Sequence, residues 1–206
     1  MPEQVDYVDA DDRLVRSGPR GGAAREGLHH RVAATVLTAP TGPPDHVLVH
    51  RRPPHLTVLP GHYDVLVGGS VRAGESYGAA AARELAEELG VRAAHGGPHE
   101  LWRERVEGPT GPCWLAVHHA RLAPDEELRP DPHAIAWHAF VPLSGLGLRA
   151  GQPLVAAEAP FAPYAPYAPF APVGLHVLRA LAHLLPALLP PDSQPPASGG
   201  SRARCA

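Results

Sequence analysis

Three carboxylates lie close together on one predicted helix. The apolar spacing from Ser76 to Leu89 predicts an amphipathic helix, and Glu84, Glu87 and Glu88 recur on it at i, i+3 and i+4. At about 100° per residue, these three side chains fall within roughly one-third of the helix circumference. Like charges at this spacing repel one another, and a divalent cation that prefers oxygen ligands relieves the repulsion. The pattern indicates a metal site, and the alternative is a solvated acidic helix face.

The residues around these carboxylates favour the metal site. Gly68-Gly69 places flexible backbone just before the helix, where a carbonyl can join a metal shell or a phosphate chain can approach closely. Glu75 stands at the junction of loop and helix, and an ion pair with Arg83 is expected to lock the two together. Ser76 suits the N-cap and Gly90 suits the residue after the helix.

Residues 69–91 resemble the Nudix box, G-x5-E-x7-R-E-U-x-E-E-x-G-U, in which U is aliphatic. All nine defined positions are filled at the required spacing, by Gly69, Glu75, Arg83, Glu84, Leu85, Glu87, Glu88, Gly90 and Val91. The resemblance implies an α/β/α sandwich around a central mixed β-sheet. It also implies that Glu84, Glu87 and Glu88 bind Mg²⁺ or Mn²⁺, and that Glu84 or Glu87, or a loop carboxylate, acts as the base on water. Gly69 then shapes the loop, and Glu75 and Arg83 hold it.

The implied activity is metal-dependent hydrolysis of a phosphoanhydride bond. The expected substrate is a small molecule, a nucleoside diphosphate linked to another moiety or a related diphosphate. Such hydrolysis needs neutralised phosphate oxygens and a water of lowered pKa, and a metal supplies both. Two alternatives are an isopentenyl-diphosphate isomerase-like enzyme and a non-catalytic binding or regulatory module of the same fold.

The flanks of the box are similar to the isopentenyl-diphosphate-isomerase-like branch of the superfamily. The similarity lies in Leu28-His29, in residues 49–52 and in residues 60–64. Isomerases of that branch use a Cys beside Gly-His before the box, where this chain has Val67-Gly68-Gly69. They also use a Glu-x-Glu near residues 110–113, which is absent here. These departures, together with the complete box, favour a hydrolase.

Three further residues are candidates for substrate binding. Arg51 and Arg52 end a predicted strand, and one of them should face the cleft and contact phosphate. His29 matches one metal-ligand position of the isomerases. Cys113 is expected to be a small buried strand residue, because no base is identifiable beside it.

Strand-like segments outnumber helices and follow hairpin-like spacings, which predicts an α+β fold with a mixed sheet. Strands are expected at 31–39 and 47–52, which can form a hairpin, and at 65–67, 101–107, 113–122 and 134–143. The chain divides into a strand or hairpin with a connector (1–28), a Nudix domain (29–150), an Ala-Pro-aromatic linker (151–172), an amphipathic helix (173–189) and a disordered Pro-rich tail (190–206).

The composition excludes several classes of protein. The 206 residues carry a net charge of −3, which argues against nucleic acid as a partner. Cys113 and Cys205 cannot build a disulfide framework or a CxxC metal site. The acidic start, residues 1–13, lacks an apolar signal segment, and no run of 18 apolar residues suggests a membrane span. A cytoplasmic location is expected, and the oligomeric state is not indicated.

Overall fold

The computed structural model describes residues 3–40, 46–92, 97–142, 146 and 170–188, and the side chains only as far as residue 181. Its strands are β1 Gln4–Val8, β2 Leu14–Pro19, β3 His29–Thr38, β4 His46–Arg51, β5 Tyr63–Asp64, β6 Leu66–Ser70, β7 His99–Gly108, β8 Gly111–Arg121 and β9 Trp137–Pro142. The helices are the short 3₁₀ helix η1 Ala23–Glu26, α1 Tyr77–Leu89 and α2 Pro172–Leu188. None of the helices in these ranges is long and apolar enough to cross a membrane.

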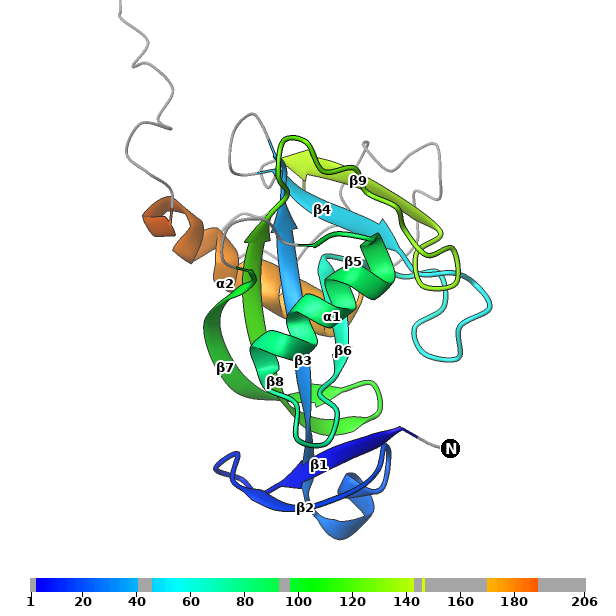
Figure 1. The fold of residues 1–206 in the computed structure, drawn as a ribbon, viewed down its shortest axis with the longest axis vertical. Coiled ribbons are helices and arrows are strands. Elements are labelled where there is room, and N and C mark those ends of the chain that lie inside the picture. The colour runs from blue at the N-terminus through cyan, green and yellow to red at the C-terminus, as the bar shows by residue number, and fades with distance from the viewer. Residues whose placement is uncertain (1–2, 41–45, 93–96, 143–145, 147–169, 189–206) are drawn as a thin grey trace, which may run out of the picture.

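Strand β3 is the centre of one mixed sheet (Figure 1). It pairs antiparallel with β6 on one side and parallel with β8 on the other, and β7 extends the sheet beyond β8. The β1–β2 ribbon joins the start of β3 through the pair Tyr7↔His30. The predicted mixed sheet is therefore confirmed.

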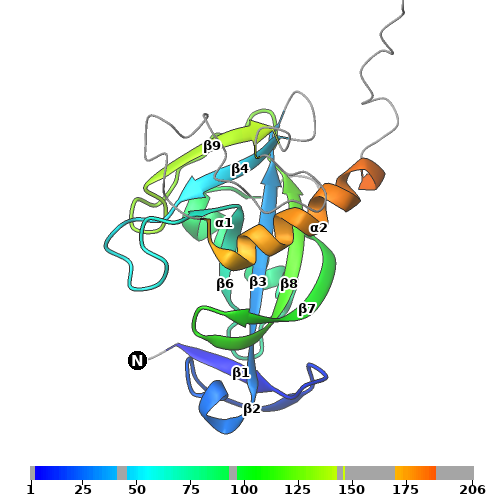
Figure 2. The ribbon, with the colours of Figure 1, turned by 180° about the vertical axis from the view of Figure 1, so that it is seen from behind.

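The two α-helices cover opposite faces of this sheet. Figure 1 shows α1 in front of β3 and β6, and Figure 2, seen from behind, shows α2 across the other face. Alternation along the strands explains both contacts, since successive side chains point to opposite faces. Ala33 and Leu37 of β3 pack with residues of α1, whereas Ala34 and Val36 belong to the cluster that includes α2. This arrangement is the expected α/β/α sandwich.

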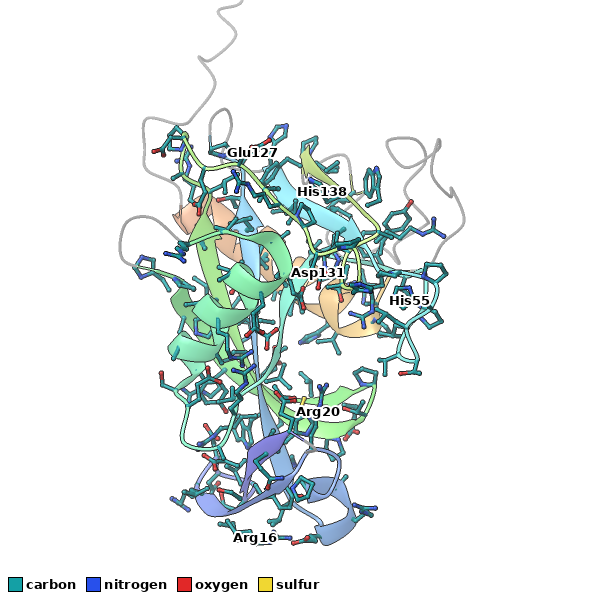
Figure 3. The ribbon with its side chains drawn as sticks, turned by 45° about the vertical axis from the view of Figure 1, so that its right-hand side comes forward. Arg16, Arg20, His55, Glu127, Asp131 and His138 are labelled. Atoms are coloured by element: carbon teal, nitrogen blue, oxygen red, sulfur yellow. The ribbon has the colours of Figure 1, made fainter. Side chains whose placement is uncertain are left out.

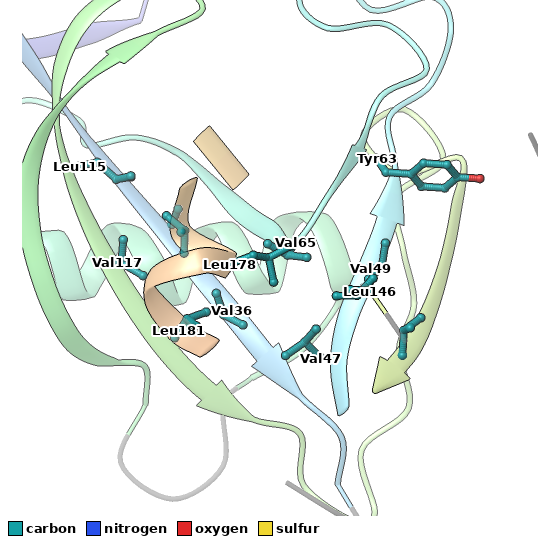
Figure 4. Close-up of a cluster of buried hydrophobic side chains, with 13 residues drawn as sticks. Val36, Val47, Val49, Tyr63, Val65, Leu115, Val117, Leu146, Leu178 and Leu181 are labelled. Atoms are coloured by element: carbon teal, nitrogen blue, oxygen red, sulfur yellow. The ribbon is translucent and has the colours of Figure 1, made fainter. Parts of the chain in front are cut away.

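The largest core cluster lies between the sheet and α2 (Figure 4). Val36, Leu115 and Val117 of the sheet meet Leu178 and Leu181 of α2 there, and all are at most 1% exposed. Burial of such side chains contributes about 1.5–3 kcal/mol each, so α2 belongs to the folded body. The helix expected at 173–189 is observed within one residue at each end, whereas the wider division into domains stays a prediction.

The expected hairpin of β3 and β4 is only partly correct. The two strands pair at Thr38↔Val47, after which β4 leaves β3 and pairs with β9 and β5. Val47 and Val49 of β4 nevertheless belong to the same core cluster as Val36 of β3 and Leu178 and Leu181 of α2. The Ala-Pro-aromatic segment, apart from residues 170–172, and the Pro-rich tail lie outside the described residues.

Candidate active site

Helix α1 has well-defined ends, which fix where its acidic side chains lie. The Ser76 hydroxyl accepts a hydrogen bond from Ala79 N at 3.2 Å, and Gly90 adopts the left-handed conformation with φ 70° after the last turn. Both are the roles expected from the sequence. Leu85 and Leu89 are fully buried on the sheet side, so the carboxylates occupy the rest of the helix surface.

Arg83 forms hydrogen bonds with several residues of the Nudix box at once. Its guanidinium donates to both carboxylate oxygens of Glu75, at 2.9 and 3.0 Å, and to the Ser70 carbonyl at 2.9 Å. It also donates to Glu84 at 2.6 Å and Glu87 at 3.2 Å. The predicted ion pair between Glu75 and Arg83 is therefore present, and it fastens the loop at the end of β6 to α1.

Gly69 leaves the space that the Glu84 carboxylate occupies. A Cβ at Gly69 would lie 2.5 Å from Oε1 of Glu84 and 2.7 Å from its Cδ, so only glycine allows this carboxylate to lie against β6. Neighbouring Gly68 packs as closely on the backbone of Ala33 and Ala34. The two glycines thus bring strand, loop and helix together at the carboxylates.

The acidic side chains differ in their electrostatic surroundings. Burial raises the pKa of Glu84, although its hydrogen bond from Arg83 opposes the effect. Burial and the neighbouring Glu84 raise the pKa of Glu88 to about 8. Glu87 is exposed and pairs with Arg72 at 3.3 Å as well as with Arg83.

Two further carboxylates add to this negative site, and Arg52 opposes them. Asp64, at the end of β5, and Asp131 both raise the pKa of Glu88, whereas Arg52 lowers it. The Asp131 amide donates to the Glu88 carbonyl at 2.8 Å, and Asp131 is labelled in Figure 3. Asp64 was missed in the sequence because the two-residue strand that places it has no periodicity to detect.

This donor set suits a hard divalent cation. Glu84 and Glu88 lie one turn apart, and the Glu88 carboxylate makes no hydrogen bond or ion pair within the described part of the chain. A cation would relieve the charge repulsion that, together with burial, raises the pKa of Glu88. Glu87 lies toward Arg83 and Arg72, and Glu84 also accepts a hydrogen bond from Arg83, at 2.6 Å. Within the described residues, no three acidic, His or Cys side chains are already gathered around one point. The chemistry of these carboxylates therefore fits Mg²⁺ or Mn²⁺.

A cleft of about 430 Å³ opens on the α2 face of the sheet, beside this carboxylate group. Gly69 lines the cleft and also touches Glu84, so the two features share a wall. The polar or charged side chains along the cleft are Arg20, His30, Arg52, Thr57, Asp64, Ser70, Glu107, Thr110 and Cys113. In Figure 3, Arg20 lies beside the β7–β8 hairpin at the far end from α2.

Of the three residues predicted to bind substrate, only Arg52 lines the cleft. Arg52 lines it, and its Nε donates to the Val58 carbonyl at 3.2 Å. Arg51 does not line it and donates to the Gly61 carbonyl at 3.1 Å. His29 is likewise outside, and the neighbouring His30 takes that place, because residues 30, 32 and 34 of β3 share the cleft face.

Cys113 is buried, as expected, but it also lines the cleft. It pairs in register with His30 across β3 and β8. Burial raises the pKa of the Cys113 thiol to about 11 and lowers the pKa of His30 to about 4. Both groups are therefore uncharged near neutral pH, and the thiol is not activated as a nucleophile.

Comparisons with known proteins agree with this geometry. The NUDIX domain family matches residues 28–163. An uncharacterized Nudix hydrolase of Streptomyces coelicolor is 39% identical over 73% of this chain and 80% of its own. A second, from Pseudomonas aeruginosa, is 36% identical over 68% of this chain and 78% of its own.

Solved structures show the same fold. A Deinococcus radiodurans protein superposes with a TM-score of 0.62 at 23% identity, covering 86% of this chain and 98% of its own. The NUDIX domain of Shewanella oneidensis NrtR, solved with ADP ribose, gives 0.54 at 16% identity, over 76% and 88% of the two chains. With the family match and the two relatives, these findings show that the chain belongs to the Nudix family and is a Nudix hydrolase.

Proposed function

We propose that this protein hydrolyses the phosphoanhydride bond of a small organic diphosphate in a reaction that depends on Mg²⁺ or Mn²⁺. The substrate is a nucleoside diphosphate derivative or a related diphosphate. One observation carries the proposal: Gly69 touches the Glu84 carboxylate and also lines the cleft. A diphosphate in the cleft therefore reaches the acidic face of α1 across the glycine backbone of β6.

The chain's own residues supply binding, orientation and a base. Glu84 and Glu88, with Glu87, hold the metal, which when bound neutralises phosphate charge and lowers the pKa of water. Glu84 or Glu87 accepts the proton of the attacking water. Arg52 lines the cleft and faces the diphosphate as a cation. Arg83 donates hydrogen bonds to Glu75 and to the Ser70 carbonyl, and so holds the loop in a fixed position relative to the carboxylates of α1.

Leu28-His29, residues 49–52 and residues 60–64 are the basis for a finer assignment. We assign the chain to the isopentenyl-diphosphate-isomerase-like branch, as a hydrolase. The Cys113 thiol is buried in the cleft with a raised pKa, which does not favour isomerase acid–base chemistry at that residue. Net double-bond isomerisation of isopentenyl diphosphate by the purified protein would contradict this assignment.

The test is a panel of nucleotides and organic diphosphates with and without Mg²⁺, with Glu88→Gln as the matched variant. Gln keeps the shape of Glu but removes the anionic ligand. We expect phosphomonoester products only with metal, and a loss of about 100-fold or more in the variant. Metal-independent turnover, or equal turnover by the variant, contradicts the proposal. Binding without turnover of any member supports the non-catalytic alternative.

A further inference from the structure

The loop between β6 and α1, residues 71–76, lies against the β1–β2 ribbon (Figure 1). Val5 of β1 forms an isolated antiparallel bridge with Arg72 of the loop. The Ala73 amide donates a hydrogen bond to the Gln4 carbonyl at 3.0 Å, so the loop backbone is paired with β1. Because this loop belongs to the Nudix box, β1 contacts the box from outside it.

Asp6 adds a side-chain contact to this backbone pairing. Its Oδ2 accepts a hydrogen bond from the Gly74 amide at 3.1 Å, and its Oδ1 accepts one from the Ser17 hydroxyl at 2.7 Å. Arg31 also lies 3.9 Å from Oδ2. Ser17 is directly opposite Asp6 on β2, and Asp6 is buried. The carboxylate therefore joins both strands of the ribbon to the loop, at a residue whose φ of 77° favours glycine.

Gly74 directly precedes Glu75, and Glu75 holds the loop to α1. Arg83 donates to both oxygens of the Glu75 carboxylate, at 2.9 and 3.0 Å. It also donates to Glu84 and Glu87. A displacement of Gly74 therefore reaches the acidic face of α1 through a single ion pair.

A second contact attaches the ribbon to the start of α1. The Asp12 carboxylate, in the turn between β1 and β2, accepts a hydrogen bond at 3.1 Å from the hydroxyl of Tyr77, the first residue of α1. Arg31 and Arg103 donate to the same carboxylate at 2.6 and 2.7 Å. The ribbon should therefore stay attached to the helix when only the contact between Asp6 and Gly74 is removed.

We propose that Asp6 is a positioning residue for the hydrolytic reaction. It fixes Gly74, which lies 68 residues away in the chain, and through Glu75 and Arg83 it fixes the carboxylates of α1. The inference rests on the proposed function and extends the site from the Nudix box to the β1–β2 ribbon. In this role the Asp6 carboxylate acts through the loop, without contacting metal or substrate. A displacement of catalytic groups by about 1 Å can lower a rate about 100-fold, so a small movement of the loop has a measurable effect.

Three variants of the full-length protein separate this role from simple stabilisation. Asp6→Ser keeps a hydroxyl opposite Ser17 but ends one bond short of the Gly74 amide, so it should lower kcat about tenfold or more and change KM less than about threefold. Asp6→Asn keeps an oxygen that accepts from Gly74 but removes the charge that faces Arg31, and its kcat should stay within about threefold of the wild type. Ser17→Ala removes only the hydrogen bond between the strands and should leave kcat unchanged.

The rates are measured with Mg²⁺ on the best substrate of the panel, and circular dichroism verifies that the variants are folded. A folded Asp6→Ser protein with the kcat of the wild type overturns the proposal. So does an Asp6→Asn protein as slow as Asp6→Ser, or an equal fall in kcat for Asp6→Ser and Ser17→Ala.

Amide hydrogen exchange tests the contact without substrate. Gly74 is exposed, yet in the wild type its amide should exchange at least about tenfold more slowly than an amide without a hydrogen bond. In Asp6→Ser this protection should be lost, whereas Ala73, bonded to Gln4, should stay protected. A Gly74 amide that exchanges freely in the wild type overturns the proposal even if Asp6→Ser does not fold. A protected Gly74 in a wild type that hydrolyses no member of the panel refutes the proposed reaction, and leaves Asp6 as the residue that fixes the box loop.

Discussion

Replacing Arg83 by Met should destabilise the protein strongly, although the residue lies on the surface of a helix. Its guanidinium makes five hydrogen bonds, to Glu75, Glu84, Glu87 and the Ser70 carbonyl. The side chains of Arg83, Glu75 and Glu84 are only 14%, 16% and 12% exposed. Removal of one partner therefore leaves carboxylates that are poorly solvated and unpaired.

Breaking a buried ion pair from one side costs about 3–5 kcal/mol, and the residual exposure here places the expected loss near the lower end, about 3 kcal/mol. For a chain of this size that corresponds to a fall in Tm of about 6–12 °C. Arg83→Lys keeps the charge but cannot form the two-pronged contact with Glu75, so it should lose about half as much.

Urea unfolding followed by circular dichroism measures these losses, provided that the m-value is unchanged. Arg13→Met is the control, because Arg13 pairs with Asp11 at 74% and 65% exposure and should cost under about 0.5 kcal/mol. Combining Arg83→Met with Glu75→Gln should cost less than the sum of the two, by about 1–3 kcal/mol. A loss below about 1 kcal/mol for Arg83→Met, or strict additivity, refutes the role given to Arg83.

Three other substitutions have defined outcomes. Gly69→Ala places a methyl 2.5 Å from the Glu84 carboxylate and should lower kcat about 100-fold, measured by product release; unchanged kcat contradicts the packing. Gly174→Ala places a methyl group that overlaps Oδ1 of Asp64 and should loosen α2, seen as faster amide hydrogen exchange at residues 173–181; unaltered exchange contradicts that contact. The third concerns His30, whose pKa falls from 6.5 to about 4 through burial and then nearby Arg20. As the pH falls, the unfolded chain protonates His30 before the folded chain does, and this favours unfolding. The contribution of neutral, buried His30 to the free energy of unfolding is therefore fully present above about pH 6.5, and it decreases by about 3 kcal/mol as the pH falls to about 4. Urea unfolding of His30→Gln should show a flatter decrease over this window, and a profile parallel to the wild type contradicts the assignment.

The box and its helix were predictable because their chemistry is local. Ser76, Gly90 and the Glu75–Arg83 pair act over a few residues of one loop and one helix, and all are found where the spacing places them. The mixed sheet also followed from the strand patterns. The metal ligands, Glu84, Glu87 and Glu88, and the catalytic base, Glu84 or Glu87, remain predictions.

The cleft was harder to predict because it is assembled from distant segments. His30 rather than His29 faces it, since the side of β3 that faces outward depends on which helix covers each face. Asp64 reaches the site through a two-residue strand, and α2 closes the cleft from more than 100 residues away in the chain. No local pattern in the sequence records such contacts.

The Mg²⁺ dependence of diphosphate hydrolysis, compared between the wild type and Glu84→Gln, tests the central claim most directly. The account predicts a rate that rises to saturation with Mg²⁺ in the wild type. It predicts a variant that is about 100-fold or more slower at the same metal concentration and remains folded by circular dichroism. A folded Glu84→Gln protein with the wild-type rate and the wild-type Mg²⁺ dependence would contradict the assignment of the α1 carboxylates as the catalytic site.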